Sequence, residues 1–149
     1  MYYGNDKNVN GGIIMSTTIH CSLEAAAEYE QKGKLAFSEN HFDKAVALLH
    51  ESLRLYRECE NRDEIAGVYN MIGVICGAQG DNVRAVKHYL RGLEVAEEQG
   101  LFHVLGQVYN NLGNEYQNLG RHENAIDYFL RAIDAFKHIN ADRYDRYNV

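Results

Sequence analysis

A forty-residue repeat is the feature of this 149-residue sequence that most constrains its fold. When the sequence is written in rows of forty, similar residues align in six columns: Tyr29, Tyr69 and Tyr109; Gly33, Gly73 and Gly113; Ala45, Ala85 and Ala125; Val46, Val86 and Ile126; Leu49, Tyr89 and Phe129; Leu53, Leu93 and Ile133. Six columns in register are not expected by chance. One such unit cannot bury its apolar face alone, so the repeat predicts units that stack on one another.

Each row is divided by residues that favour the end of a helix. Gly and Asn accept the left-handed conformation that closes a helix, and one such column holds Asn40, Gly80 and Gly120. A second column holds Glu60, Gly100 and Asn140, of which the last two fit the same role. Asn61, with Glu64 three residues on, resembles a capping box. The pattern predicts helices over about 22–39, 42–59, 62–79, 82–99, 102–119 and 122–139.

The glycine column predicts close contact between helices. A glycine in the middle of a helix is destabilising by ~1 kcal/mol relative to Ala. A position that tolerates this cost three times is expected to allow a neighbouring helix to approach. We expect the alanine column of the second helices to supply the matching small surface.

These residues resemble the motif of the tetratricopeptide repeat family. The motif is matched most fully in the third row, by Tyr109, Leu112, Gly113, Tyr116, Gly120, Ala125, Phe129 and Ala132. The second row departs from it at Cys76 and Gly92, and the first row departs at Lys32 and Ala36. The resemblance covers residues 26–139.

The resemblance implies an all-α fold, a right-handed α-solenoid of three helix-turn-helix repeats over about 22–60, 61–100 and 101–140. We expect residues 1–21 to form a flexible N-terminal segment. Shifted by forty, residues 141–149 align with the start of a first helix, so they predict the beginning of a fourth helix pair or a cap. The open C-terminal end, around Ala132, Phe136 and Ile139, is then expected to support a homo-oligomer.

The period of forty also narrows the functional classes, because the common period of the family is 34. Repeats of about forty residues resemble those of kinesin light chains, Pins-type adaptors and Rap-type peptide receptors, which are scaffolds for peptides or proteins. Similar repeats serve as sensory regions of bacterial diguanylate cyclases and sensor kinases. Three functions therefore stay open: a non-catalytic binding scaffold, a sensory or dimerising segment of a larger signalling protein, and a purely structural solenoid.

An unusual stripe of amides follows one face of the helix predicted over 102–119. Its members are Gln107, Asn110, Asn111, Asn114, Gln117 and Asn118. Each Asn costs up to ~0.7 kcal/mol of helix propensity, yet an amide offers both a donor and an acceptor for the main chain of an extended peptide. In the alternative interpretation, the amides bond one another, bridge repeats or face water.

The resemblance places the first helix of each repeat on the concave surface, so the same face of the other repeats extends the candidate groove. The second repeat contributes Asn70, Met71 and Val74, and the first contributes Gln31 and Lys34. The carboxylate clamp of chaperone adaptors is not expected. Its places hold Glu30, Lys34, Met71, Gln107 and Asn111, among which only Lys34 is cationic.

Charge and motif content exclude several other classes. The net charge of −6 argues against nucleic acid and anionic membranes as partners, and no apolar stretch approaches the ~20 residues of a membrane span. Three cysteines, Cys21, Cys59 and Cys76, indicate free thiols in the cytoplasm. The seven histidines lack zinc-site spacing, and no phosphate-binding loop is present. We therefore expect no enzyme activity, no metal and no cofactor, and a protein or extended peptide as partner.

Overall fold

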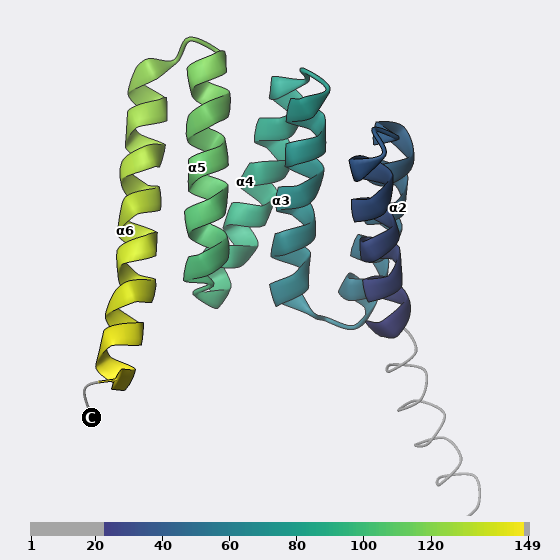
Figure 1. Ribbon diagram of the computed structural model, residues 1–149, viewed down its shortest axis with the longest axis horizontal. Helices are drawn as coiled ribbons and strands as arrows, with labels where there is room; N and C mark the ends of the chain where they lie inside the picture. The colour runs from purple at the N-terminus through teal and green to yellow at the C-terminus, as the bar shows by residue number, and fades with distance from the viewer. Residues whose placement is uncertain (1–22, 148–149) are drawn as a thin grey trace, which may run out of the picture.

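Short turns divide the chain into helices that stand side by side in a row (Figure 1). The computed structural model describes residues 23–147, with side chains as far as residue 143. Within residues 23–147 there is no strand, and the first helical segment covers residues 23–38. The helices that follow are α2 (Phe42–Glu58), α3 (Arg62–Ala78), α4 (Asn82–Gln99), α5 (Phe102–Asn118) and α6 (His122–Tyr147). The predicted N-terminal segment, 1–21, lies outside the described residues.

The turns use the left-handed backbone conformation expected of them. Asn40, Gly80 and Gly120 have φ values of 61°, 79° and 72°. In the second turn column, Gly100 has a φ of 64°, and Glu60 adopts the same conformation with a φ of 53° although it is not a glycine. A non-glycine residue is uncommon in this region, so the geometry of the turn, and not the preference of Glu60, determines the conformation there.

The turn expected at Asn140 is absent, because α6 continues through it to Tyr147. Asn tolerates a helical conformation at modest cost, whereas Gly100 at the equivalent position favours the left-handed conformation strongly. The sequence after Asn140 contains no proline or glycine that would end the helix. Residues 141–147 therefore extend α6 and do not begin a separate helix.

Neighbouring helices pack as hairpins, and the hairpins pack on each other. The most extensive contacts join α3 to α4 and α5 to α6, while α2 with α3, α4 with α5 and, to a smaller extent, α3 with α5 make contacts between hairpins. The glycine column allows this packing. A Cβ atom built on Gly73 would lie 2.5 Å from a ring carbon of Tyr89, and one on Gly113 would lie 2.5 Å from a ring carbon of Phe129.

The partner of the glycine column therefore differs from the one we expected. Large side chains of the second helix fill the space beside the glycines. Leu49 lies beside Gly33, as Tyr89 and Phe129 of the same column lie beside Gly73 and Gly113. The alanine column is buried in all three repeats. The small alanine lets the second helix pack close to the first. The glycine of the first helix then leaves space for the large side chain that the second helix carries one turn after the alanine.

Two tyrosines of the tyrosine column connect the first helices α3 and α5 to the hairpins that precede them. The guanidinium of Arg57 donates a hydrogen bond to the hydroxyl oxygen of Tyr69. Forty residues later, the hydroxyl of Tyr109 donates to Glu97, with 2.8 Å between the oxygens. Arg57 and Glu97 occupy the same column, so the phenol accepts at one junction and donates at the other.

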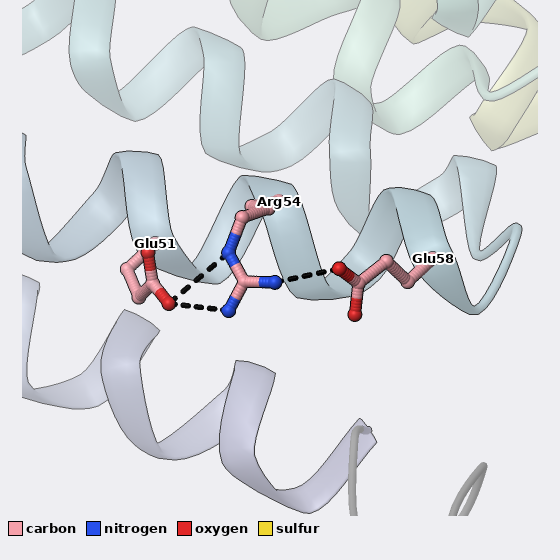
Figure 2. Close-up of polar contacts among 3 residues, drawn as sticks. All are labelled: Glu51, Arg54 and Glu58. Atoms are coloured by element: carbon pink, nitrogen blue, oxygen red, sulfur yellow. Dashed lines mark hydrogen bonds and ion pairs between the residues drawn. The ribbon is translucent and has the colours of Figure 1, made fainter.

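Exposed ion pairs occupy the outer surface of α2. Arg54 donates to Glu51 at 3.1 and 2.5 Å and to Glu58 at 2.6 Å, so that one guanidinium bridges two carboxylates on the same helix (Figure 2). All three side chains are exposed. Such pairs contribute little to stability, and this surface is a solvated face of the helix.

Two glycines of α3 should respond in opposite ways to alanine. We expect Gly73→Ala to lower the free energy of unfolding by about 1–3 kcal/mol, because its Cβ would overlap the buried ring of Tyr89. Gly67→Ala should raise it by up to ~1 kcal/mol, because no atom lies within 4 Å of the added Cβ and alanine is the better helix former. Urea denaturation of both variants checks this; equal effects would show that the close contact is absent.

Candidate functional site

A hollow of about 300 Å³ opens where the first helices of the three repeats meet. The residues that line it come from the segment 23–38, from α3 and from α5: Glu30, Lys34, Phe37, Gly67, Asn70, Met71, Val74 and Gln107. Five of these were predicted groove residues, namely Lys34, Asn70, Met71, Val74 and Gln107. The structure thus brings together residues up to 77 positions apart in the sequence, since Glu30 and Gln107 line the same hollow.

The floor of the hollow is apolar. Phe37, Met71 and Val74 are half-buried and pack against the core, so each also presents part of its side chain to the opening. The ring of Phe37 lies 5.9 Å from the ring of Phe42, centroid to centroid, and this contact limits its freedom. The thioether of Met71 is flexible and polarisable. The floor can therefore adapt to an apolar side chain of a ligand.

The charges at one end of the hollow are already paired. Lys34 Nζ lies 2.6 Å from a carboxylate oxygen of Glu30, and the hydroxyl of Tyr56 donates to the other oxygen at 3.0 Å. Tyr56 belongs to α2, so this network fixes Glu30 from outside the groove. Because the carboxylate of Glu30 lies beside its ammonium, Lys34 presents little net charge to an anionic ligand. This end of the hollow is polar but close to neutral.

One amide of the stripe bridges two repeats. The Nδ2 group of Asn111 on α5 donates to Oδ1 of Asn70 on α3, with 2.9 Å between the atoms. Asn111 is half-buried, as is Asn70. This pair supports the alternative interpretation of the stripe, in which amides form hydrogen bonds between neighbouring repeats. Gln107 makes a local contact instead, 3.1 Å from Nε2 of His103 on the same helix.

The other predicted amides are exposed and lie beside the hollow instead of lining it. Asn110, Asn114, Gln117 and Asn118 follow α5, and Gln31 lies exposed on the first segment. Within the described residues, the side chains of Asn110 and Asn114 make no hydrogen bond or ion pair. Their donors and acceptors therefore face solvent and are available to a ligand.

Three lining residues were not among the predicted groove residues: Glu30, Phe37 and Gly67. The repeat register contains a signal for each of them. Gly67 stands forty residues before Gln107, while Phe37 and Glu30 stand eighty before Gln117 and Asn110. The register therefore places them on the same face of the first helices, although their side chains share no chemistry with an amide.

Glu115 is a buried acid on α5. It occupies the column that holds Ile75 in the second repeat, and its Oε2 atom has no hydrogen-bond partner within the described part of the chain. A Cβ built on Gly77 would lie 2.5 Å from its Oε1, so the absence of a side chain at Gly77 makes room for the carboxyl group. Burial raises the pKa of Glu115, although a hydrogen bond from Asn118 acts in the opposite direction.

No cluster of metal-binding side chains is formed among the described residues. The buried ring of His88 stacks on Tyr69 at a centroid distance of 6.4 Å and lies 5.9 Å from the ring of His50. Burial, and then the positive charges of His50 and neighbouring basic residues, lower the pKa of His88 to about 4. Neutral His88 thus belongs to the packing between hairpins. Nor does any helix in residues 23–147 combine the length and apolarity of a membrane span.

Sequence comparison identifies the family. A family model described as "Tetratricopeptide repeat" matches residues 23–98 and, one repeat later, residues 64–138. The chain belongs to the tetratricopeptide repeat family. The two matches overlap because each spans two consecutive repeats, as the forty-residue register requires. Among curated proteins, no relative matches the sequence.

Solved structures with the same fold share little sequence with this tetratricopeptide repeat protein. The TPR domain of Arabidopsis FLU has a TM-score of 0.73 at 16% identity, covering 78% of this chain and 98% of that one. The N-terminal domain of stress-induced protein-1 from C. elegans has a TM-score of 0.68 at 18% identity, covering 77% and 87%. BtubC (BKLC) from P. vanneervenii has a TM-score of 0.68 at 20% identity, covering 84% and 58%. At these identities, the likeness shows the fold alone.

Two asparagines on α5 should differ in their effect on stability. We expect Asn111→Ala to lower the free energy of unfolding, since the bond to Asn70 is worth about 0.5–1.5 kcal/mol and a half-buried amide loses its partner. Asn114→Ala should raise it by up to ~0.7 kcal/mol, because only helix propensity changes at this exposed site. Urea denaturation separates the two, and a gain for both variants would contradict the bridging role of Asn111.

Replacement of Glu115 should make stability less dependent on pH. Because the folded-state pKa is raised above its ordinary value of 4.5, the stability contributed by Glu115 is present below that value and is lost as the pH rises through the folded pKa. We expect Glu115→Gln to gain melting temperature relative to the wild type as the pH rises from about 4.5 towards neutrality. Exposed Glu94→Gln is the control. A pH-independent difference for Glu115→Gln would contradict the expectation.

Proposed function

We propose that this tetratricopeptide repeat protein is a non-catalytic scaffold that binds an extended segment of a partner protein across its three first helices. The observation that carries the proposal is the hollow lined by residues of all three first helices. It combines an apolar floor with unpaired amides alongside. Apolar pockets beside groups that bond main chain are the two components of extended-peptide recognition.

The chemistry of the groove supports a ligand without a strong charge. An apolar side chain would contact Phe37, Met71 and Val74, which line the hollow and pack against the core. The free amides of Asn110 and Asn114 would pair with main-chain N–H and C=O groups, whatever the sequence of the ligand. A ligand carboxylate gains little at the other end, where Lys34 is paired with Glu30.

The two alternatives lead to different expectations. A purely structural solenoid would use its surface for no specific ligand. A sensory or dimerising segment of a larger signalling protein, of the diguanylate cyclase or kinase type, would use the same groove or another face to change the state of a neighbouring domain.

The thiol of Cys76 is buried and free. A free thiol is typical of a reducing compartment, so we propose a cytoplasmic location for the protein.

Peptide display tests the proposal. A random peptide library displayed on phage is selected on the 149-residue chain, and affinities of the enriched peptides are measured by calorimetry. We expect Val74→Glu, which places a charge on the floor of the hollow, to weaken binding by roughly tenfold or more. Val83→Glu is the matched control, because Val83 is exposed on α4 and does not line the hollow.

A second set of variants tests the amides. Asn110→Ala and Asn114→Ala should each weaken the same peptides by about twofold to tenfold, the range expected for one lost hydrogen bond. Circular dichroism of every variant verifies that the helices are intact. The proposal fails if no peptide is enriched, or if the enriched peptides bind Val74→Glu as tightly as they bind the wild type. The first outcome favours a structural solenoid, and the second shows that the peptides bind outside the hollow.

A further inference from the structure

The outer face of α6 carries an apolar stripe that no described residue covers. Its members are Ile126, Leu130 and Ile133, which are 58%, 57% and 50% exposed. Figure 1 shows α6 at the end of the row of helices. We had expected the open face to include Ala132, but Ala132 is buried, because α6 turns its small residues towards α5. Ile126, Leu130 and Ile133 define the α6 stripe.

The equivalent positions of the first two repeats can be compared with the α6 stripe. Leu53 and Leu93 occupy the column of Ile133 and are only 2% and 8% exposed, against 50% for Ile133. In the first two repeats, the helix that follows covers this column, through the contacts of α2 with α3 and of α4 with α5. At Ile133 the α6 stripe therefore continues a column that is covered in the first two repeats, whereas Leu90, in the column of Leu130, is 40% exposed. The apolar chemistry of the α6 stripe suits another amphipathic helix.

The opposite end of the row cannot supply that helix. Val68 and Val108 are buried in the second and third repeats, and the first repeat has Glu28 in their column. Lys32 likewise replaces a buried aliphatic residue, and its Nζ lies 2.5 Å from Glu28 in an exposed ion pair. Stacking copies head to tail would bury this pair against the α6 stripe and remove it from water at considerable cost.

We propose that two copies of the chain pair through the α6 stripe about a two-fold axis, with the two α6 helices antiparallel. The exposed apolar surface of each copy is then covered by the same surface of the other, as an isologous interface requires. The inference does not depend on the groove, which uses the first helices.

The charges that flank the α6 stripe favour the antiparallel arrangement. Glu123 and Lys137 share its face at opposite ends, fourteen residues or about 21 Å apart along the helix. Lys137 Nζ lies 3.9 Å from a carboxylate oxygen of Asp134, an exposed pair on the same helix that is weak enough to exchange for a partner across the interface. In an antiparallel pair, Glu123 of one copy approaches Lys137 of the partner subunit, and the reverse contact forms at the other end. The stripe is thus complementary to itself in charge as well as in shape.

Sedimentation equilibrium over a roughly hundredfold range of protein concentration tests the pairing. We expect a monomer–dimer equilibrium for the 149-residue chain, since an interface of one helix per copy belongs to the weak class. Ile133→Glu should raise the dissociation constant by roughly tenfold or more, because it buries an unpaired charge. Leu90→Glu is the matched control: Leu90 is also exposed and lies forty residues before Leu130 in the same column.

A charge exchange tests the orientation. Glu123→Lys alone and Lys137→Glu alone should each weaken the dimer, because each places like charges together at both ends of the α6 stripe. The double variant should restore dimerisation to near the wild-type level. A strictly monomeric chain at all concentrations, or a dimer that Ile133→Glu leaves unchanged, would overturn the proposal. A dimer weakened by Ile133→Glu but not restored by the double variant would overturn the antiparallel arrangement.

Discussion

Close approach of the two helices in each hairpin is the constraint on which this structure depends. At Gly33, Gly73 and Gly113 the first helix has no side chain, and a large residue of the second helix occupies the space. Because the same contact recurs every forty residues, each hairpin has nearly the same internal geometry, and the first helices are arranged along one side. The hollow between those helices is a consequence of that arrangement.

The hollow itself is lined by apolar, amide and charged side chains, and its two charged residues pair with each other. Glu30 is bonded both by Lys34 within the groove and by Tyr56 behind it. At about 300 Å³, the volume is at the lower limit of small-molecule pockets. It accommodates one or two side chains of a longer ligand better than it accommodates a whole metabolite. The exposed amides extend the same surface along α5.

Local signals in the sequence predicted the helices well, because apolar spacing and turn residues act over one or two helical turns. Asn140 shows the limit of such signals: it is a turn residue by type, yet α6 continues through it to Tyr147. The site was less predictable. That Asn111 would bond Asn70 depends on the distance between α3 and α5, and the residue facing each glycine depends on how two helices are rotated. Neither quantity is encoded within a single helix.

The tyrosine column has a consequence for how such a stack can change over time. A phenol hydroxyl accepts from Arg57 at one junction and donates to Glu97 at the next, so the contact between hairpins tolerates either sign of charge at the same place. After a unit is duplicated, substitutions can therefore reverse the charge of this edge without separating the repeats. The surface potential of the protein is free to diverge from one repeat to the next while its backbone remains periodic.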